Sequence, residues 1–232
     1  MPTLKEQLLE GKLYSKTPYW GNTLAKAKSD VRAMLARTES PYLALSWGKQ
    51  SIVMAHLVFS IEQKILCVHW TGPDAELIAN FQKTSETFLS RWPLNYLELQ
   101  RSEKLRDAIE EYKKRTHPDG VFIGLSAFES RARRITTRIA DGNNIYRYSD
   151  GMLRCCPLAK WKLLELATYI AEYEIPLLNT YERFGLDVRT STGCREGGRT
   201  EHAIDFMTRS NSEKMRKIWR EKHEYETVEN NI

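Results

Sequence analysis

The chain has 232 residues, of which 41% are hydrophobic and 10% aromatic, enough for one compact α/β domain with appendages and too many for a globally disordered chain. Its 35 basic and 30 acidic side chains give a net charge of only +5, so charge alone does not indicate a nucleic-acid-binding protein. The sequence has no run of about 18 uncharged apolar residues and no apolar signal at its start, so we expect a soluble, cytoplasmic protein without a membrane partner.

An amphipathic pattern over residues 22–37 predicts a helix ahead of a region in which apolar strands alternate with helices, which is typical of parallel βαβ units. The predicted strands are 42–46, 64–69, 94–99 and 120–125, and the helices between them are 49–60, 73–91 and 103–115. We therefore predict an α/β fold with a Rossmann-like, doubly wound, mostly parallel sheet and helices on both faces. Ligands bind such sheets beyond the carboxyl ends of the strands.

The pattern loosens after the fourth predicted strand. It predicts a helix at 130–140, a short strand at 145–148, a helix at 161–173 and a charged helix at 213–225. We predict three parts: an N-terminal helical segment at 1–40, a central domain at 41–209 and a charged helical C-terminal extension at 210–232.

The sharpest local pattern lies where the first strand runs through a bend with one glycine into a helix. The bend reads Ser46-Trp47-Gly48-Lys49-Gln50-Ser51. Backbone N–H groups at the positive end of a helix dipole attract anions, and the two hydroxyls and the lysine add donors. The bend is not a Walker A loop because the first glycine of that motif is missing. It predicts a phosphate site.

These residues resemble the PP-loop of the adenine nucleotide α-hydrolase-like superfamily, and in particular that of the PAPS (phosphoadenylylsulfate) reductase family. Three later segments are similar to motifs of that family in the same order. They read His69-Trp70-Thr71-Gly72-Pro73-Asp74-Ala75-Glu76, Gly124-Leu125-Ser126-Ala127-Phe128-Glu129-Ser130-Arg131-Ala132-Arg133-Arg134, and Cys156-Pro157-Leu158-Ala159-Lys160-Trp161. The resemblance covers about residues 42–185.

The resemblance implies an enzyme that binds an adenine nucleotide. It implies that the bend holds phosphate or sulfate and that Thr71 and Gly72 line the ribose or adenine. It also implies that Arg131 and Arg133 neutralise the far phosphate. Glu129 is either a ligand or a charge favoured by a helix dipole. The implied nucleotide-binding residues are Ser46, Trp47, Gly48, Lys49, Gln50, Ser51, Thr71, Gly72, Glu129, Arg131 and Arg133.

The sequence departs from this family in its catalytic cysteine. PAPS reductases attack the sulfur with a cysteine in a C-terminal Glu-Cys-Gly-Leu-His segment, and no cysteine follows Cys194 here. Cys194 lies in a glycine-rich, basic stretch in which Arg189 and Arg195 are candidates for an anion or substrate loop, and neighbouring positive charge lowers a thiol pKa. We take Cys194 and Lys49 as the catalytic candidates; the alternative is that Cys194 is an inert loop residue.

The other cysteines and one histidine have simpler interpretations. Cys67 lies in an apolar run and is predicted to be a small core residue. Cys155 and Cys156 are adjacent, which is an awkward arrangement for cluster ligands, so an iron–sulfur cluster is not expected and no metal ligands are assigned. His69, at a strand end, is either a ligand or a residue bonded to the backbone.

Several functions stay open. The leading hypothesis is a PAPS reductase-like enzyme that acts on the phosphate or sulfate of PAPS, APS or ATP, with ATP or PAPS as cofactor and Mg²⁺ as an optional companion. The alternatives are an ATP-dependent adenylating sulfurtransferase, a DNA or RNA modification factor and an inactive nucleotide sensor. The expected partner is a small-molecule nucleotide; a nucleic acid, a sulfur-donor or thioredoxin-type protein and a homodimer stay open.

Overall fold

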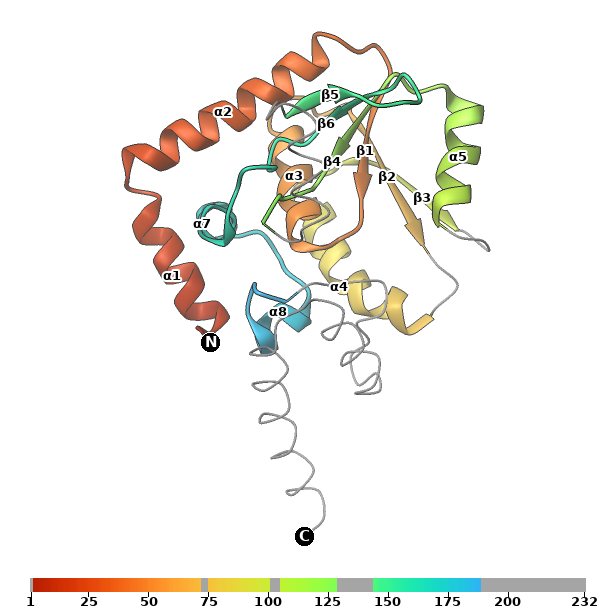
Figure 1. Ribbon diagram of the computed structural model, residues 1–232. Coiled ribbons are helices and arrows are strands. Elements are labelled where there is room, and N and C mark those ends of the chain that lie inside the picture. Colours follow the sequence, from red (N-terminus) through yellow and green to blue (C-terminus); the bar gives the residue numbers. More distant parts are fainter. Residues whose placement is uncertain (1, 72–74, 101–104, 129–143, 189–232) are drawn as a thin grey trace. The chain divides into compact units, whose positions relative to one another are not determined.

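The computed structural model describes residues 2–71, 75–100, 105–128 and 144–188 (Figure 1). Within these residues the strands form a six-stranded sheet in the order β3-β2-β1-β4-β6-β5, in which β5 is antiparallel to β6 and the other pairs are parallel. The strands are β1 (Pro41–Leu45), β2 (Leu66–Thr71), β3 (Asn95–Gln100), β4 (Gly120–Ile123), β5 (Ile145–Arg147) and β6 (Leu153–Cys155). The predicted mostly parallel α/β sheet is confirmed, and β6 is an addition to it.

The helices between the parallel strands, α3 (Lys49–Phe59), α4 (Ala75–Arg91) and α5 (Leu105–Thr116), agree with the prediction to within two residues at each end. The other helices are α1 (Leu4–Tyr14) and α2 (Pro18–Leu35) before the sheet, and α7 (Leu163–Tyr173) and α8 (Asn179–Phe184) after it. Helices α1 and α8 were not expected from the pattern. The predicted helices at 130–140 and 213–225 lie outside the described residues.

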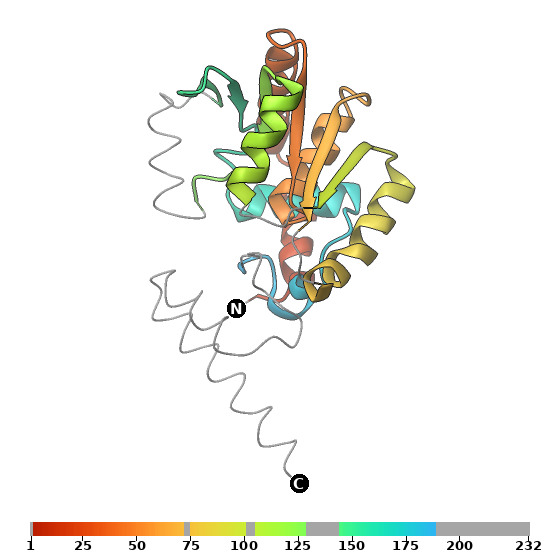
Figure 2. The ribbon, with the colours of Figure 1, turned by 90° about the vertical axis from the view of Figure 1, so that its right-hand side faces the viewer.

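Alternate residues of each strand face opposite sides of the sheet, and helices cover both sides (Figure 2). On one side, Tyr42, Val68 and Trp70 pack with Tyr112 of α5. On the other side lies Cys67, which is fully buried, and burial raises the pKa of its thiol to about 12. The prediction of Cys67 as a core residue is confirmed.

The order of the strands determines where the sheet can bind a ligand. Strand β1 pairs with β2 on one side and with β4 on the other, because the chain runs outwards from β1 through β2 to β3 and then returns to the opposite side of β1 as β4, so that the strand order reverses between β1 and β4. At such a reversal the connections after the two central strands diverge and open a crevice at the carboxyl ends. Helix α3 begins at Lys49, four residues beyond the end of β1, and its N-terminus therefore lies at this point.

Helix α1 docks on α7 through a glycine. A Cβ atom at Gly11 would lie 2.7 Å from the backbone nitrogen of Thr168 and 2.8 Å from the carbonyl carbon of Ala167, so only glycine permits this approach of the two helices. Thr3 and Glu6 form a capping box that begins α1. None of the helices in the described part of the chain is both long enough and apolar enough to span a membrane.

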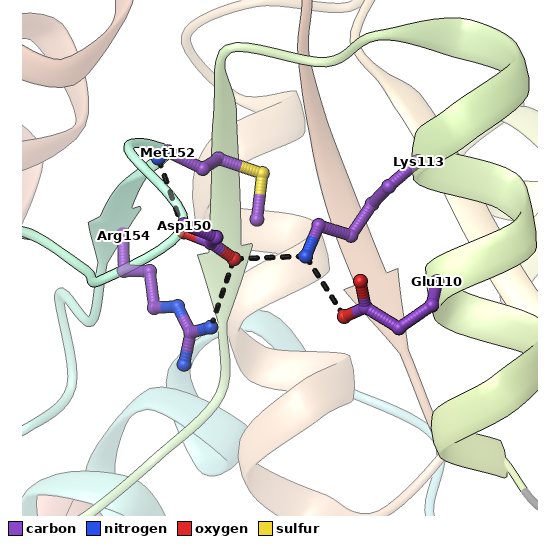
Figure 3. Close-up of polar contacts among 5 residues, drawn as sticks. All are labelled: Glu110, Lys113, Asp150, Met152 and Arg154. Atoms are coloured by element: carbon purple, nitrogen blue, oxygen red, sulfur yellow. Dashed lines mark hydrogen bonds and ion pairs between the residues drawn. The ribbon is translucent and has the colours of Figure 1, made fainter.

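The β5–β6 hairpin is attached to α5 by a cluster of charged side chains (Figure 3). The Asp150 carboxylate accepts hydrogen bonds from Lys113 Nζ at 2.8 Å and from the backbone N–H of Met152 at 3.1 Å, and Lys113 also donates to Glu110 at 2.9 Å. Arg154 reaches Asp150 at 3.5 Å and stacks on the ring of Tyr148. We call these residues the hairpin cluster.

Candidate functional site

Residues 46–51 come together in one bend between β1 and α3, as predicted. Gly48 is the N-cap of α3, and no side chain caps the helix there. The hydroxyl of Ser51 accepts a hydrogen bond from the backbone N–H of Ser46 at 2.8 Å and donates to the carbonyl of Ala44 at 3.5 Å. Ser51 therefore closes the bend on itself and fixes the direction in which the first N–H groups of α3 point.

Trp47 anchors the bend in the protein core. Its backbone φ of 59° lies in the left-handed region, which costs a bulky residue about 1 kcal/mol or more. Its indole is fully buried, with the rings of His69, Phe88 and Tyr96 about it at centroid distances of 6.4, 5.9 and 5.8 Å. The side chain of Trp47 is thus committed to the core, and the prediction of Trp47 as a nucleotide-binding residue stays a prediction.

Lys49 is held by one residue of α8 and by one residue that follows this helix. Its backbone N–H donates to the Tyr181 hydroxyl at 3.1 Å, and its Nζ donates to the carbonyl of Val188 at 2.7 Å. The ammonium also lies 5.3 Å from the centre of the Tyr181 ring, and the residue is only 3% exposed. A positive charge is therefore fixed beside the N-terminus of α3 by a distant part of the chain.

The chain that leaves β4 passes against the first turn of α3. A Cβ atom at Gly124 would lie 2.8 Å from both Cα and N of Ser51 and 2.9 Å from the carbonyl carbon of Gln50. These are backbone atoms of a helix, which cannot move aside individually. Gly124 therefore allows the two connections at the crevice to meet.

The end of β4 is in turn bonded to the segment before α7. Ser126 donates from its hydroxyl to the carbonyl of Trp161 at 2.7 Å, and the N–H of Ala127 donates to the carbonyl of Ala159 at 2.8 Å. Two of the segments that resemble PAPS reductase motifs, more than 30 positions apart in the chain, are thus hydrogen-bonded neighbours. Ser126 is buried here as a structural residue.

Thr71 and His69 lie at the carboxyl end of β2. The Thr71 hydroxyl donates to Glu98 of β3 at 2.6 Å, and His69 donates from Nδ1 to the carbonyl of Leu45 at 2.9 Å. Burial lowers the pKa of His69, which favours the neutral imidazole. The interpretation of His69 as a residue bonded to the backbone is confirmed.

Several predicted residues lie outside the described part of the chain and stay predictions. They are Gly72, Glu129, Arg131, Arg133, Arg189, Cys194 and Arg195. Conversely, the structure adds Tyr181 and Val188 to the surroundings of the bend. Their hydrogen bonds to Lys49 join residues more than 130 positions apart, for which no local pattern exists.

Within the described residues, no group of three or more His, Cys, Asp or Glu side chains could hold a metal ion. Cys155 and Cys156 are both buried, and burial raises the pKa of Cys155 far above its usual value. Cys155 therefore has neither the exposure nor the lowered pKa of a reactive cysteine, and Cys156 lacks the exposure.

The fold has well-defined counterparts among solved structures. The PAPS reductase of Candida auris, in a phosphate complex, matches with a TM-score of 0.55 at 10% identity, over 79% of this chain and 93% of the reductase. The FMN adenylyltransferase of Candida glabrata, in complex with FAD and inorganic pyrophosphate, matches with a TM-score of 0.56 at 13% identity, over 78% of this chain and 72% of the transferase.

A third counterpart is the U34-tRNA thiolase NcsA of Methanococcus maripaludis with its 4Fe-4S cluster, with a TM-score of 0.51 at 14% identity, over 67% of this chain and 64% of the thiolase. No protein-family model and no curated protein matches the sequence. The chain therefore shares a Rossmann-like α/β fold with these three enzymes. The expected resemblance to PAPS reductase is confirmed at the level of the fold.

Proposed function

We propose that this protein is a PP-loop enzyme that binds an adenine nucleotide, ATP or PAPS, with its phosphates at the 46–51 bend. The observation that carries the proposal is the position of this bend. It lies at the reversal of strand order, at the N-terminus of α3 and beside the Lys49 ammonium. Three fold neighbours support it: one was solved with phosphate, one with FAD and pyrophosphate, and one is a tRNA thiolase.

The reaction that suits such a site takes place at the phosphate or sulfate end of the nucleotide. With ATP, an oxygen of the second substrate would attack the α-phosphorus and pyrophosphate would leave. With PAPS, a thiolate such as that of Cys194 would attack the sulfur and adenosine 3′,5′-bisphosphate would leave. In both reactions Lys49 and the α3 N-terminus would stabilise negative charge on the leaving group.

Isothermal calorimetry with ATP, PAPS and adenosine 3′,5′-bisphosphate tests this proposal. We expect one of them to bind and to raise the melting temperature, because a ligand selective for the folded state stabilises it by mass action. Lys49→Met keeps the length of the side chain and removes its charge. A charge-assisted hydrogen bond to phosphate contributes about 1.5–3 kcal/mol, so we expect affinity to fall about tenfold to hundredfold.

Lys113→Met is the control, because the Lys113 ammonium is also hydrogen-bonded and its side chain is only 15% exposed, but it belongs to the hairpin cluster. We expect it to leave nucleotide affinity unchanged. The proposal fails if no adenine nucleotide binds, or if both methionine variants weaken binding equally. Turnover of Cys194→Ser with the nucleotide that binds then tests the catalytic role of the cysteine.

A further inference from the structure

The short segment after α8 lies between α1 and α3 and is bonded to both. Gln7 of α1 accepts a hydrogen bond from the backbone N–H of Leu186 at 2.7 Å through Oε1, and it donates to the Asp187 carboxylate at 2.7 Å through Nε2. The next residue, Val188, accepts the hydrogen bond from Lys49 Nζ. Three consecutive residues thus connect the amide of Gln7 to the ammonium of Lys49.

Gln7 is built into this position. It is 4% exposed, and its one amide group bonds to two consecutive residues, which fixes both the place and the rotation of their backbone. Gly185 precedes them with φ of 72°, and a Cβ atom there would lie 3.0 Å from Gln7 Oε1. A glycine is therefore required where the segment meets the glutamine.

The position of the Val188 carbonyl matters because a lysine side chain has a flexible stem and takes its place from its partners. One residue of extended chain spans about 3.4 Å. A slip of the segment by a single position would therefore move the carbonyl out of hydrogen-bond range of Nζ. The Val188 carbonyl stays within hydrogen-bond range of the Lys49 ammonium only while the segment stays in register.

We propose that Gln7 is a positioning residue for the nucleotide site: it holds residues 186–188 in register, so that the Val188 carbonyl keeps the Lys49 ammonium beside the phosphate-binding bend. This inference rests on the proposed function for its effect on nucleotide affinity. It makes α1, which contributes no residue to the bend, a part of the binding site.

A double-mutant cycle on the full chain, with ATP and PAPS as probes in calorimetry, tests this role. We expect Gln7→Ala to weaken binding about threefold to tenfold. In a Lys49→Met background the same substitution is expected to have no further effect, because Gln7 acts only through the lysine. Full additivity of the two losses would overturn the proposal, because it would mean that Gln7 acts by general destabilisation.

Exchanging the side-chain amide at position 7 with the carboxylate at position 187 tests whether nucleotide binding can be restored. Gln7→Glu alone places a carboxylate against Asp187 and is expected to weaken binding as much as Gln7→Ala. Adding Asp187→Asn in the same chain lets the new carboxylate accept from the introduced side-chain amide and from the Leu186 N–H, so we expect binding within twofold of the parent. If the double variant binds no better than Gln7→Glu, the hydrogen bonds to residues 186–187 do not position the site.

Glycine substitutions test the same contact from the other side. Gly185→Ala is expected to weaken binding as Gln7→Ala does, because its Cβ displaces the glutamine. Gly151→Ala is the control: Gly151 has a similar positive φ of 83° but an added Cβ meets nothing within 4 Å. Equal losses in the two variants would contradict the proposal.

Acetylation of Lys49, measured by mass spectrometry without nucleotide, separates this inference from the proposed function. We expect Gln7→Ala to raise the rate of acetylation of Lys49 at least threefold and to leave that of Lys113 unchanged. If the parent binds no nucleotide but Lys49 becomes reactive, the proposed function fails and the positioning contact stands. An unchanged rate for Lys49 refutes the positioning role.

Discussion

Two lysines, Lys49 at the bend and Lys113 in the hairpin cluster, are held in opposite ways. Lys113 is bonded to the carboxylates of Asp150 and Glu110 on a half-exposed surface (Figure 3). Burial lowers the pKa of Lys113, but the hydrogen bonds from the ammonium to Asp150 and Glu110 outweigh it, so that this pKa is raised overall. Lys49 is almost fully buried and is bonded to a backbone carbonyl beside an aromatic ring.

The difference shows how strongly the hairpin cluster and the bend each depend on individual contacts with surrounding residues. In the hairpin cluster, solvent and salt screen the charges, so each contact contributes little and can be replaced. Around the bend, backbone is packed against backbone, and hydrogen bonds come from fixed positions in α1 and in the segment after α8. Small changes in side-chain volume or protonation should therefore lower the free energy of unfolding far more near the bend than near the hairpin.

The largest effect is expected from Gly124→Ala. Its new methyl group would overlap the backbone of Ser51 and Gln50, so we expect the free energy of unfolding to fall by about 3 kcal/mol. Denaturation in urea measures it. Gly21→Ala in α2 is the control, because a Cβ there meets nothing within 4 Å, and it should raise stability by about 0.5–1 kcal/mol. If Gly124→Ala lowered the free energy of unfolding by less than about 1 kcal/mol, the backbone at the bend could move enough to accommodate the added methyl group.

An intermediate effect is expected from His56, which lies on α3 and is hydrogen-bonded to Tyr169 at 2.8 Å. Burial, with a smaller contribution from the charge of Lys28, lowers the pKa of His56 to about 4. The unfolded chain, with a histidine pKa of about 6.5, takes up the proton first. Stability is thus complete above about pH 6.5 and falls as the pH drops towards 4, by about 2 kcal/mol for this group.

The variant His56→Gln removes this titration and keeps a hydrogen-bonding group near Tyr169. Urea denaturation at pH 7 and pH 4.5 compares it with the parent. We expect the loss of stability between the two pH values to be smaller in the variant by about 2 kcal/mol. Equal losses in both proteins would mean that His56 is protonated in the folded state as readily as in the unfolded chain.

The smallest effect is expected from Asp150→Asn in the hairpin cluster. Burial raises the pKa of Asp150, but the Lys113 ammonium and the Met152 N–H lower it further than burial raises it, so the carboxylate favours the folded state above about pH 4. We expect the variant to lose about 0.5–1 kcal/mol at pH 7, and less in 1 M NaCl. A loss larger than that of Gly124→Ala, or one that salt leaves unchanged, would reverse the contrast between the two regions.

The sheet and the bend could be predicted from the sequence because both depend on local pattern. Apolar strands, helical spacing and one glycine between β1 and α3 place residues 46–51 at a strand-to-helix turn, and the structure has them there. Helix α1 falls in the helical segment predicted at 1–40, but its bounds and its docking were not predicted, because the docking depends on Gly11 meeting the backbone of Thr168, a contact that no periodicity marks. Strands β5 and β6 have three residues each, and of these two short strands only β5 was predicted.

The orientation of the side chains at the bend could not be predicted. Trp47 looks like a ligand-facing residue in the linear sequence, but its left-handed backbone turns the indole into the core against β2, β3 and α4. The partner of Lys49 lies 139 positions further along the chain. Such contacts follow from the assembled fold, and the sequence shows beforehand only the chemical type of the residue, a lysine at a strand-to-helix turn.

The distance between Gln7 and its partner also bears on how the protein is made. Leu186 follows Gln7 by 179 positions, and ribosomes add about 5–20 residues per second, so roughly 9–36 s separate the synthesis of the two. During most of that interval, neither of the partners of α1 has been synthesised: Thr168 of α7, against which Gly11 docks, comes 18 positions before Leu186. Helix α1 can therefore complete its docking only after all six strands of the sheet have been synthesised.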